Sequence, residues 1–504
     1  MVTINVANHY SKIKGKLPDT VKGILYDKLS FTLDGYFFSE KYQGGHWDGK
    51  SRLFNRKTQS FLTGLLSYVR EVLDKHHIQY NLFDLRTKPQ PNMNLSLIDT
   101  AGHGKGGDLW EHQALCVERA LQRKRGVFEV STGGGKTIIV AGIIAALQVR
   151  PFVFFVLSKD LMYQAQDQLE MTILDNNYGR KVEVGVIGDG KCKIRDINIV
   201  MVQSAVQALG EEYVPMDDED TQAVNASEVT DHKEEIVDLL QRCKGWYFDE
   251  CQHLSAPTAQ LMAKSTPNAY YRYGGSATPY RDDGADILIE AVTAKKFISI
   301  PASYLIKKGV LMKPIIHIIP IKTYEEHCQS EDENERKSAL SNNYNSIYSN
   351  YIVKNEYRNN IIVRTATEFI AQGLSVLILV KYIKHGDILQ DMIPGSVFLQ
   401  GSTPGEERQD IIQTLRDKQV LCVIATSLAD EGLDVKTLNS IIIAGSGKSS
   451  TKAFQRVGRV LRTAEGKRTA IVVDFYDNAP YLRAHSKRRI KLYKSEPEFE
   501  IIRH

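Results

Sequence analysis

Two short stretches of this 504-residue sequence combine residue types that can act on a phosphate ester. The first, at residues 131–137, reads "STGGGKT" and stands between the apolar runs "GVFEV" and "TIIVAGIIAAL". Its glycines allow backbone N–H groups to wrap phosphate oxygens at a helix N-terminus, where the helix dipole favours anions. Lys136 would reach the terminal phosphates and Thr137 would bind Mg²⁺. The stretch predicts a phosphate-binding loop, although Val130 stands where the strict pattern has its first glycine.

The second stretch, "GWYFDE" at residues 245–250, ends an apolar run with two carboxylates. An acidic pair after a strand is, on its own, more often a solvated loop. Together with the glycine-rich loop it predicts hydrolysis of a nucleotide, because phosphoryl transfer depends on positioning and charge neutralisation. Asp249 would hold Mg²⁺ through its water shell, and Glu250 would orient and deprotonate the attacking water.

Two later stretches add polar groups to the same prediction. "GSATP" (275–279) follows the aromatic run "YYRYG", and "QRVGRVLR" (455–462) places Arg459 and Arg462 three apart on one helical face. Arginines brought to the terminal phosphate from a second lobe stabilise transition-state charge and couple hydrolysis to lobe closure. Taken alone, this arginine pair would indicate only an exposed basic helix.

The elements that must position these residues follow an alternating pattern. From about residue 126, short β-branched or aromatic runs alternate with helical stretches, and the pattern starts again at "SVLILVKY". Such alternation predicts parallel sheets with flanking helices. We therefore expect a lobe over residues 96–310, a second lobe with a basic C-terminal tail over 311–504, and a small α+β domain over 1–95.

Composition limits the class of protein. The chain has a net charge of +4 and six cysteines without a C-x-x-C pair, so neither a zinc site nor a disulfide framework is predicted. No signal peptide and no run of 18 apolar residues is found, which predicts a cytoplasmic protein that does not span a membrane. Basic residues gather in the first 88 positions and at 481–494, where Tyr481 and Tyr493 stand among the cations. This pattern suits neutralisation of nucleic-acid phosphates and stacking of bases on the two tyrosines, and we expect the domain over 1–95 to bind DNA. The acidic stretch 211–235 predicts an exposed insertion without an assigned role.

The ordered motifs resemble those of superfamily-two helicases and translocases over residues 110–475. The matching stretches are "LWEHQ" (109–113), "STGGGKT", "FVLSKDLMYQ" (155–164), "IVMVQS" (199–204), "DECQH" (249–253), "SATP" (276–279), "VLILVKY" (376–382), "ATSLADEGLDV" (425–435) and "QRVGRVLR". The resemblance implies two tandem RecA-like lobes with ATP between them.

It also implies a role for individual residues. The hydrolytic and nucleotide-contacting set is Lys136, Thr137, Asp249, Glu250, Gln252, Gln455, Arg459 and Arg462, with Thr137 and Asp249 as the Mg²⁺ ligands. The ATP-binding set adds Gln113, Ser131, Thr132, Gly133, Gly134, Gly135, Gly432 and Asp434. The implied DNA contacts are Ser158, Lys159, Gln203, Ser204, Lys381 and Thr426. Ser276 and Thr278 would couple the ATP state to the strand.

The N-terminal region narrows the resemblance. "LDGYFFSEKYQGGHWDGKSRLFNRKTQSFLTGLL" (33–66) resembles the leading domain of UvsW-type bacteriophage recombination helicases. It implies an ATP-dependent DNA helicase for branched DNA, acting on Holliday junctions, stalled forks and D-loops or R-loops. Trp47 in this stretch would contact DNA, or equally pack beneath a hairpin turn. The implied partner is DNA, with no obligatory protein partner, for a monomer in the host-cell cytoplasm.

Other functions remain open from the sequence. An ATP-dependent RNA helicase would carry much the same motor, and so would the translocase subunit of a restriction system, although no nuclease-like group of residues is apparent. A nucleic-acid-binding scaffold with little ATPase would not need Lys136, Asp249, Glu250, Arg459 and Arg462 all intact.

The stretch "DECQH" departs from a common form of its motif. Relatives commonly read D-E-x-H, so Gln252 stands where a coupling histidine is expected and His253 comes one residue late. Glutamine donates and accepts hydrogen bonds but does not take a proton near neutral pH. We therefore expect Gln252 to relay the nucleotide state and Glu250 alone to act as the base.

Overall fold

The computed structural model describes the chain in two compact units. One comprises residues 1–130 and 135–299, and the other residues 131–134 and 300–504. Each unit is described by itself. The described residues are 1–33, 36–98, 108–211, 232–253, 256–278, 286–333, 336–337, 343–426, 435, 437–445, 457–464 and 466–504.

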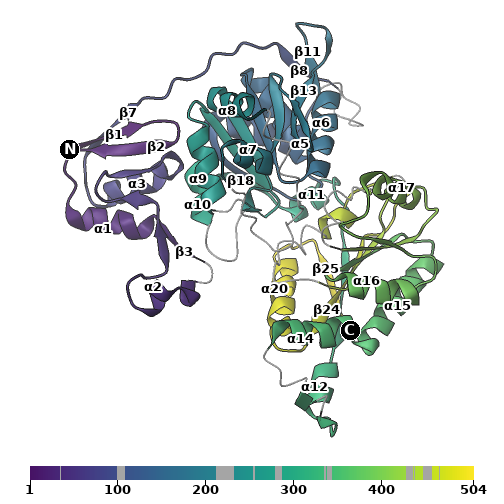
Figure 1. Cartoon of the computed structure of the whole chain (residues 1–504). Coiled ribbons are helices and arrows are strands. Elements are labelled where there is room, and N and C mark those ends of the chain that lie inside the picture. Colours follow the sequence, from purple (N-terminus) through teal and green to yellow (C-terminus); the bar gives the residue numbers. More distant parts are fainter. Residues whose placement is uncertain are drawn as a thin grey trace. The chain divides into compact units, whose positions relative to one another are not determined.

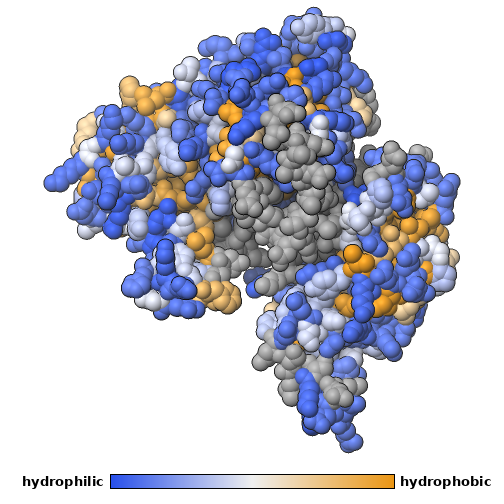
Figure 2. Space-filling view, in the orientation of Figure 1, coloured by the Kyte–Doolittle hydropathy of each residue, from blue (hydrophilic) through white to orange (hydrophobic). Residues whose placement is uncertain are grey.

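The first unit begins with the predicted α+β domain (Figure 1). Its five-stranded sheet has the order β5 (Phe54–Asn55), β6 (Ser60–Leu62), β2 (Tyr10–Lys14), β1 (Val2–Val6) and β7 (Tyr80–Asp84). Helices α1 (Asp19–Lys28) and α3 (Leu66–Lys75) pack against one face, where Ile4, Ile13 and Leu25 are fully buried. Alternate residues of β1 and β2 are buried, as a sheet covered on one side requires. Figure 2 shows hydrophobic patches among the hydrophilic side chains of this domain.

A smaller antiparallel pair, β3 (Ser30–Thr32) and β4 (Lys50–Arg52), extends from this domain and carries η1 (Tyr36–Phe38) and α2 (Glu40–Gln43). The domain is attached to the rest of its unit by polar contacts. The Arg125 guanidinium donates to the Asn8 carbonyl at 2.5 Å and to the Tyr270 carbonyl at 2.9 Å. Tyr68 Oη donates to Glu290 Oε2 at 2.5 Å. These contacts hold the domain against the larger sheet.

The larger sheet of the first unit has eight strands. Their order is β14 (Lys191–Lys193), β13 (Val184–Gly188), β15 (Ile197–Met201), β10 (Phe152–Val156), β16 (Gly245–Asp249), β17 (Tyr271–Ser276), β9 (Arg125–Val130) and β18 (Lys296–Ile300). The strands from β13 to β9 are parallel. A separate three-stranded sheet consists of β8 (Leu95–Leu97), β11 (Ile173–Asp175) and β12 (Arg180–Lys181). The predicted first parallel-sheet lobe is therefore confirmed.

The helices of this lobe fall into two groups that pack within themselves. One group is α4 (Glu111–Arg123), α5 (Lys136–Leu147) and α6 (Lys159–Thr172); the other is α7 (Val202–Ala208), α8 (Lys233–Arg242), α9 (Ala256–Ser265) and α10 (Asp286–Val292). Helix α5 is apolar, and after Ile138 all of its residues except Ala146 are buried. Its burial fixes the position of Lys136, the first residue of the helix.

The second unit contains a seven-stranded sheet in which every strand pair is parallel. Its order is β21 (Val397–Leu399), β22 (Cys422–Thr426), β20 (Val376–Val380), β23 (Ser440–Ile443), β24 (Ile471–Asp477), β19 (Ile315–Ile321) and β25 (Glu500–Arg503). The helices include α11 (Ala302–Lys307), α12 (Thr323–Cys328), α14 (Tyr344–Tyr348), α15 (Glu356–Ala371), α16 (Ile383–Met392), α17 (Gly405–Arg416) and α20 (Leu482–Lys494). The second predicted lobe is confirmed. The boundaries expected at residues 95 and 310 stay predictions.

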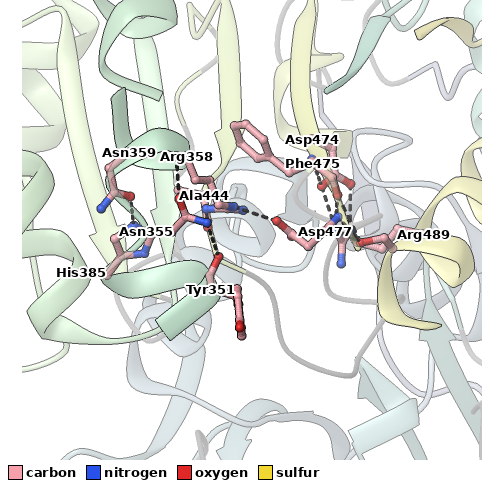
Figure 3. Close-up of polar contacts among 11 residues, drawn as sticks. Tyr351, Asn355, Arg358, Asn359, His385, Ala444, Asp474, Phe475, Asp477 and Arg489 are labelled. Carbon is pink, nitrogen blue, oxygen red and sulfur yellow. Dashed lines mark hydrogen bonds and ion pairs between the residues drawn. The ribbon is translucent and has the colours of Figure 1, made fainter. Parts of the chain in front are cut away.

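The basic stretch at 481–494 is a packed helix and not a free tail. Arg489 of α20 forms a two-bonded pair with Asp474 of β24, at 2.8 and 2.9 Å (Figure 3). Tyr493 Oη donates to the same carboxylate at 2.8 Å, and the tyrosine is fully buried. Tyr493 therefore anchors α20 and is not available to stack on a base, contrary to what the sequence suggested. Beyond α20, the chain continues into β25, which joins the sheet.

A second buried ion pair ties α15 to the same strand. Arg358 Nε donates to Asp477 Oδ1 at 2.9 Å, and Arg358 Nη1 donates to the Ala444 carbonyl at 2.5 Å (Figure 3). Buried charges are tolerated when they are paired and hydrogen-bonded.

Among the described residues, no helix is long and apolar enough to cross a membrane.

Candidate active site

The candidate site lies where three neighbouring strands of the eight-stranded sheet end. Strands β16, β17 and β9 are adjacent and parallel. Asp249 ends β16, Ser276 ends β17, and the loop after β9 leads into Lys136 of α5. Because carboxyl ends of parallel strands meet at one edge of a sheet, motifs far apart in the sequence come together here.

The Glu250 carboxylate is the point at which these motifs meet. Its Oε1 lies 3.1 Å from Lys136 Nζ. Its Oε2 accepts hydrogen bonds from Gln252 Nε2 at 3.0 Å and from Ser276 Oγ at 3.2 Å. Ser276 Oγ in turn accepts from the backbone N–H of Thr278 at 2.9 Å. The structure thus joins the glycine-rich loop, the acidic pair and the "SATP" stretch through one side chain.

The electrostatics of this contact keep Glu250 charged. Burial by itself would raise the pKa of the Glu250 carboxyl, but the Lys136 ammonium and the hydrogen bond from Gln252 outweigh it and lower that pKa. Glu250 also has a φ of +47°, a left-handed conformation that costs a non-glycine residue about 1–2 kcal/mol. A strained backbone at a charged, fully hydrogen-bonded carboxylate indicates a side chain held in place for its chemistry.

Asp249 is held by a neighbour to which the sequence motifs assign no role. Tyr247 Oη donates to Asp249 Oδ1 at 2.8 Å. The two residues are two positions apart on β16 and so lie on the same face of the strand. The Tyr247 ring is stacked on Phe128 at 5.5 Å and meets Phe154 edge-on at 4.7 Å, which fixes the hydroxyl.

Space for the Tyr247 ring is provided by Gly275 on the neighbouring strand. A Cβ at this position would lie 2.2 Å from Tyr247 Oη, so a larger residue would displace the hydroxyl from Asp249. Burial, together with the Glu250 charge, raises the pKa of Asp249 to about 6, and Lys136 partly offsets the rise. A divalent cation beside Asp249 would favour its ionised form.

The glycine-rich loop has the backbone that phosphate binding requires. Gly133 and Gly135 have φ values of +86° and +80°, which side chains other than glycine rarely adopt. A Cβ at Gly135 would lie 2.4 Å from Gln113 Nε2. Gln113 is buried against the loop, and its Oε1 accepts from the backbone N–H of Trp110 at 3.0 Å. The loop and the glutamine implied to read adenine are thus in contact.

The residues implied to contact DNA stand at the same edge of the sheet. Ser158 follows β10 and caps α6, where its Oγ accepts from the backbone N–H of Leu161 at 3.4 Å. Lys159 begins that helix. Gln203 and Ser204 lie in the first turn of α7, directly after β15, and Ser204 is buried. Contact of these residues with DNA stays a prediction.

Two further predicted DNA contacts belong to the second unit. Thr426 ends β22, and Lys381 follows β20. Lys381 Nζ lies 5.5 Å from the ring centre of Tyr348 and 5.3 Å from that of Tyr382, so aromatic faces already stabilise its charge.

Trp47 holds a turn of the N-terminal domain. Its Nε1 donates to the Lys50 carbonyl at 2.9 Å, and the ring is half-buried. The turn includes Gly49, which has a φ of +77°. This arrangement matches the hairpin alternative, and DNA contact by Trp47 stays a prediction.

Arg459 and Arg462 belong to the second unit, where residues 457–460 are helical. Burial lowers the pKa of the Arg462 guanidinium, and the backbone of Arg462 pairs with Leu311. The role of both arginines at the phosphates stays a prediction.

Three predicted nucleotide contacts, Gly432, Asp434 and Gln455, lie outside the described residues. Residues 212–231 of the acidic stretch also lie outside them.

Gln252 Nε2 donates to the Glu250 carboxylate at 3.0 Å, and the backbone N–H of His253 donates to the Glu250 carbonyl at 3.0 Å. We expect Gln252→Ala to lower the DNA unwound per ATP hydrolysed about tenfold, because a hydrogen bond to a charged group is lost. Nucleotide affinity should change much less. Parallel unwinding and ATPase assays measure the ratio. His253→Ala, the matched control, should be milder, and the reverse order would contradict the assignment.

Comparisons with known proteins agree with this site. Three family models match the chain: DNA helicase UvsW, N-terminal, at residues 3–83; type III restriction enzyme, res subunit, at residues 107–281; and helicase conserved C-terminal domain, at residues 358–464. The last two include the Lys136, Glu250 and Arg459 motifs.

Among curated relatives, the ATP-dependent DNA helicase uvsW of Enterobacteria phage T4 is 21% identical over 94% of this chain and 93% of its own length. The putative helicase 22 of a Sulfolobus islandicus filamentous virus is 25% identical to this chain. The match covers 74% of this chain and 64% of the length of that relative. A fragment of a putative HsdR subunit of a type I restriction enzyme from Vibrio vulnificus has a similar fold, with a TM-score of 0.51 and 15% identity, covering 78% of this chain and 68% of the fragment. The chain is a superfamily-two helicase with a UvsW-like N-terminal domain.

Proposed function

We propose that this helicase is an ATP-dependent motor for branched DNA, which moves Holliday junctions, regresses forks and unwinds D-loops or R-loops. The observation that carries the proposal is the UvsW-type domain at residues 3–83 joined to a complete first-lobe motor. A motor alone would fit many nucleic acids. The N-terminal domain is the part that this chain shares with DNA helicases of the phage type.

ATP and Mg²⁺ fit the residues at the site. The left-handed glycines of the loop leave backbone N–H groups free of side-chain obstruction, and Lys136 stands at the helix N-terminus beyond them. Thr137 and Asp249 supply the hydroxyl and the carboxylate that this cation prefers. When bound, Mg²⁺ would neutralise charge on the phosphate oxygens.

The hydrogen bonds of Glu250 indicate how hydrolysis would be timed. Lys136 occupies Oε1, whereas Gln252 and Ser276 hold Oε2. Movement of the Lys136 ammonium from Glu250 to a phosphate would free Oε1 to accept a proton from water, and Oε2 would remain fixed. The base would then become available only when nucleotide is bound, and Gln252 and Ser276 would sense the change.

Three other functions are weaker. An RNA helicase fits the motor, but the ATP-dependent rRNA helicase RRP3 of Candida albicans matches 38% of this chain. The N-terminal family match at residues 3–83 is to the domain of a DNA helicase. A restriction translocase would need a nuclease partner. A scaffold would not need the paired Lys136 and Glu250.

We further propose that the protein works as a monomer in the cytoplasm of the host cell.

A panel of substrates separates these functions. ATPase and unwinding should be measured on a Holliday junction, a fork, plain duplex DNA and an RNA duplex. The branched DNAs should stimulate turnover most and should be unwound. The proposal is wrong if RNA stimulates hydrolysis as well as branched DNA does and the junctions are left intact.

Lys136→Ala provides the control for this panel. The variant should bind junctions with unchanged affinity but lose hydrolysis and unwinding, because the ammonium that reaches the phosphates is removed. Turnover equal to that of the unmodified protein would disprove the phosphate-binding loop.

Helix α20 offers a second test, because its exposed face is cationic. Exposed side chains on this helix include Arg483, Lys487, Lys491 and Lys494. We expect duplex binding to weaken steeply with salt, and Lys487→Gln with Lys491→Gln to reduce the slope of log K against log salt by about 2. Binding titrations at several salt concentrations measure the slope.

The matched control for α20 is Lys354→Gln with Lys418→Gln, two exposed lysines of the same unit. This pair should leave the slope unchanged. A flat salt dependence in the unmodified protein, or equal slopes in all three proteins, would rule out α20 as a phosphate contact.

A further inference from the structure

The five-stranded sheet of the N-terminal domain has one face that the described helices leave open. Helices α1 and α3 pack on the side of Ile4 and Ile13 (Figure 1). Along β1 and β2, the residues that alternate with these buried positions point to the opposite face of the sheet. On β2 they are Tyr10, Lys12 and Lys14, all exposed.

The strand pairing places further residues on this open face. Asn5 of β1 stands opposite Lys12 of β2 on one side and opposite Phe83 of β7 on the other. Leu85 lies two residues after Phe83, at the end of the same edge strand. The exposed fractions are 42% for Tyr10, 58% for Phe83 and 53% for Leu85. Large apolar side chains are thus exposed together on one sheet, and Figure 2 shows hydrophobic surface in this part of the domain.

The charge on this face has one sign. Lys12 and Lys14 project from it, and among the described residues of β1, β2 and β7 no carboxylate shares it. The acid of β7, Asp84, is paired in register with Val6 and so faces the covered side. It is also bound by Arg86 at 2.7 and 2.8 Å. The open face therefore favours an anion with an apolar part.

A cavity gives this surface depth. It has a volume of 420 Å³ and lies between Tyr10 and Leu85, with Asn5 and Ala7 also lining it. Ligand pockets commonly have volumes of about 300–1,000 Å³. Tyr10 and Phe83 stand two strands apart and two residues apart along the strands, which is about 12 Å in total, so the two rings would take different bases.

Aromatic rings on an open sheet beside lysines are suited to one class of polymer. Exposed bases of a single strand stack on such rings, and the phosphates are neutralised by the cations. A duplex would not expose its bases to the rings. An apolar protein segment would leave both lysines without an anionic partner.

We propose that the open face of the β5-β6-β2-β1-β7 sheet binds a single strand of DNA, with bases stacked on Tyr10 and Phe83 and phosphates at Lys12 and Lys14. The choice of DNA rests on the proposed function, whereas the stacking surface does not. The face would hold an unwound strand of a branched substrate while the motor acts.

Affinity for a short single strand tests the proposal in the full-length protein without nucleotide. The probe is a fluorescent oligothymidine followed by anisotropy. Tyr10→Leu with Phe83→Leu keeps apolar volume but removes both rings. Affinity should fall at least about thirtyfold, which is the smallest loss expected for two stacked bases. Tyr10→Phe with Phe83→Tyr keeps the rings and should bind as the unmodified protein does.

The control is Tyr178→Leu, which removes a tyrosine that is 70% exposed elsewhere in the same unit. It should leave the affinity unchanged. Thermal melting shows whether each variant is folded. Photo-crosslinking with 5-iododeoxyuridine in the oligonucleotide, followed by peptide mass spectrometry, should mark Tyr10 and Phe83.

Two results would overturn the proposal. One is an unchanged affinity in the folded double variant with cross-links only outside this face. The other is a double variant that loses affinity for oligouridine but keeps its affinity for oligothymidine. That result would assign the face to RNA. The proposed function is tested separately, by junction unwinding with the unmodified protein. That activity can be measured even if the open face does not bind a single strand.

Discussion

One half-buried carboxylate organises the candidate active site of this helicase. Glu250 must stay charged at the sheet edge, where burial opposes ionisation, and Lys136, Gln252 and Ser276 compensate the charge. Each partner comes from a different motif. They meet because β16, β17 and β9 are neighbours and run in the same direction. The strand order is thus the condition for the chemistry, and the apolar strands and helix α5 maintain it.

Small residues stand where this arrangement needs close approach. Gly275 makes room for the Tyr247 ring that holds Asp249, and Gly135 lies against Gln113. The left-handed backbone of Glu250 is the opposite case, since a charged residue accepts a conformation that glycine would adopt without strain. Strain at this one position, surrounded by a rigid sheet, is consistent with a base that is positioned before nucleotide arrives.

Much of this could be predicted from the sequence, because the motifs end strands and strands end at a common edge. The alternating pattern predicted both lobes, and the motifs singled out Lys136 and Glu250, whose charged groups lie 3.1 Å apart in the structure. Contacts between distant segments could not be predicted. Tyr493 was expected to stack on bases, but it is buried and donates a hydrogen bond to Asp474. Cys192, His232 and Glu235 have ligand atoms within 4.8 Å of one another, although no cysteine spacing suggested a group of this kind.

We expect Glu250, around which the site is built, to be the catalytic base. Glu250→Gln tests it most directly, since the amide keeps the size of the side chain but cannot take a proton from water. In this variant ATP should still bind, measured by equilibrium titration, while single-turnover hydrolysis should slow by about 10²–10⁴-fold. Hydrolysis within about twofold of the unmodified rate, with binding intact, would mean that Glu250 is not the catalytic base.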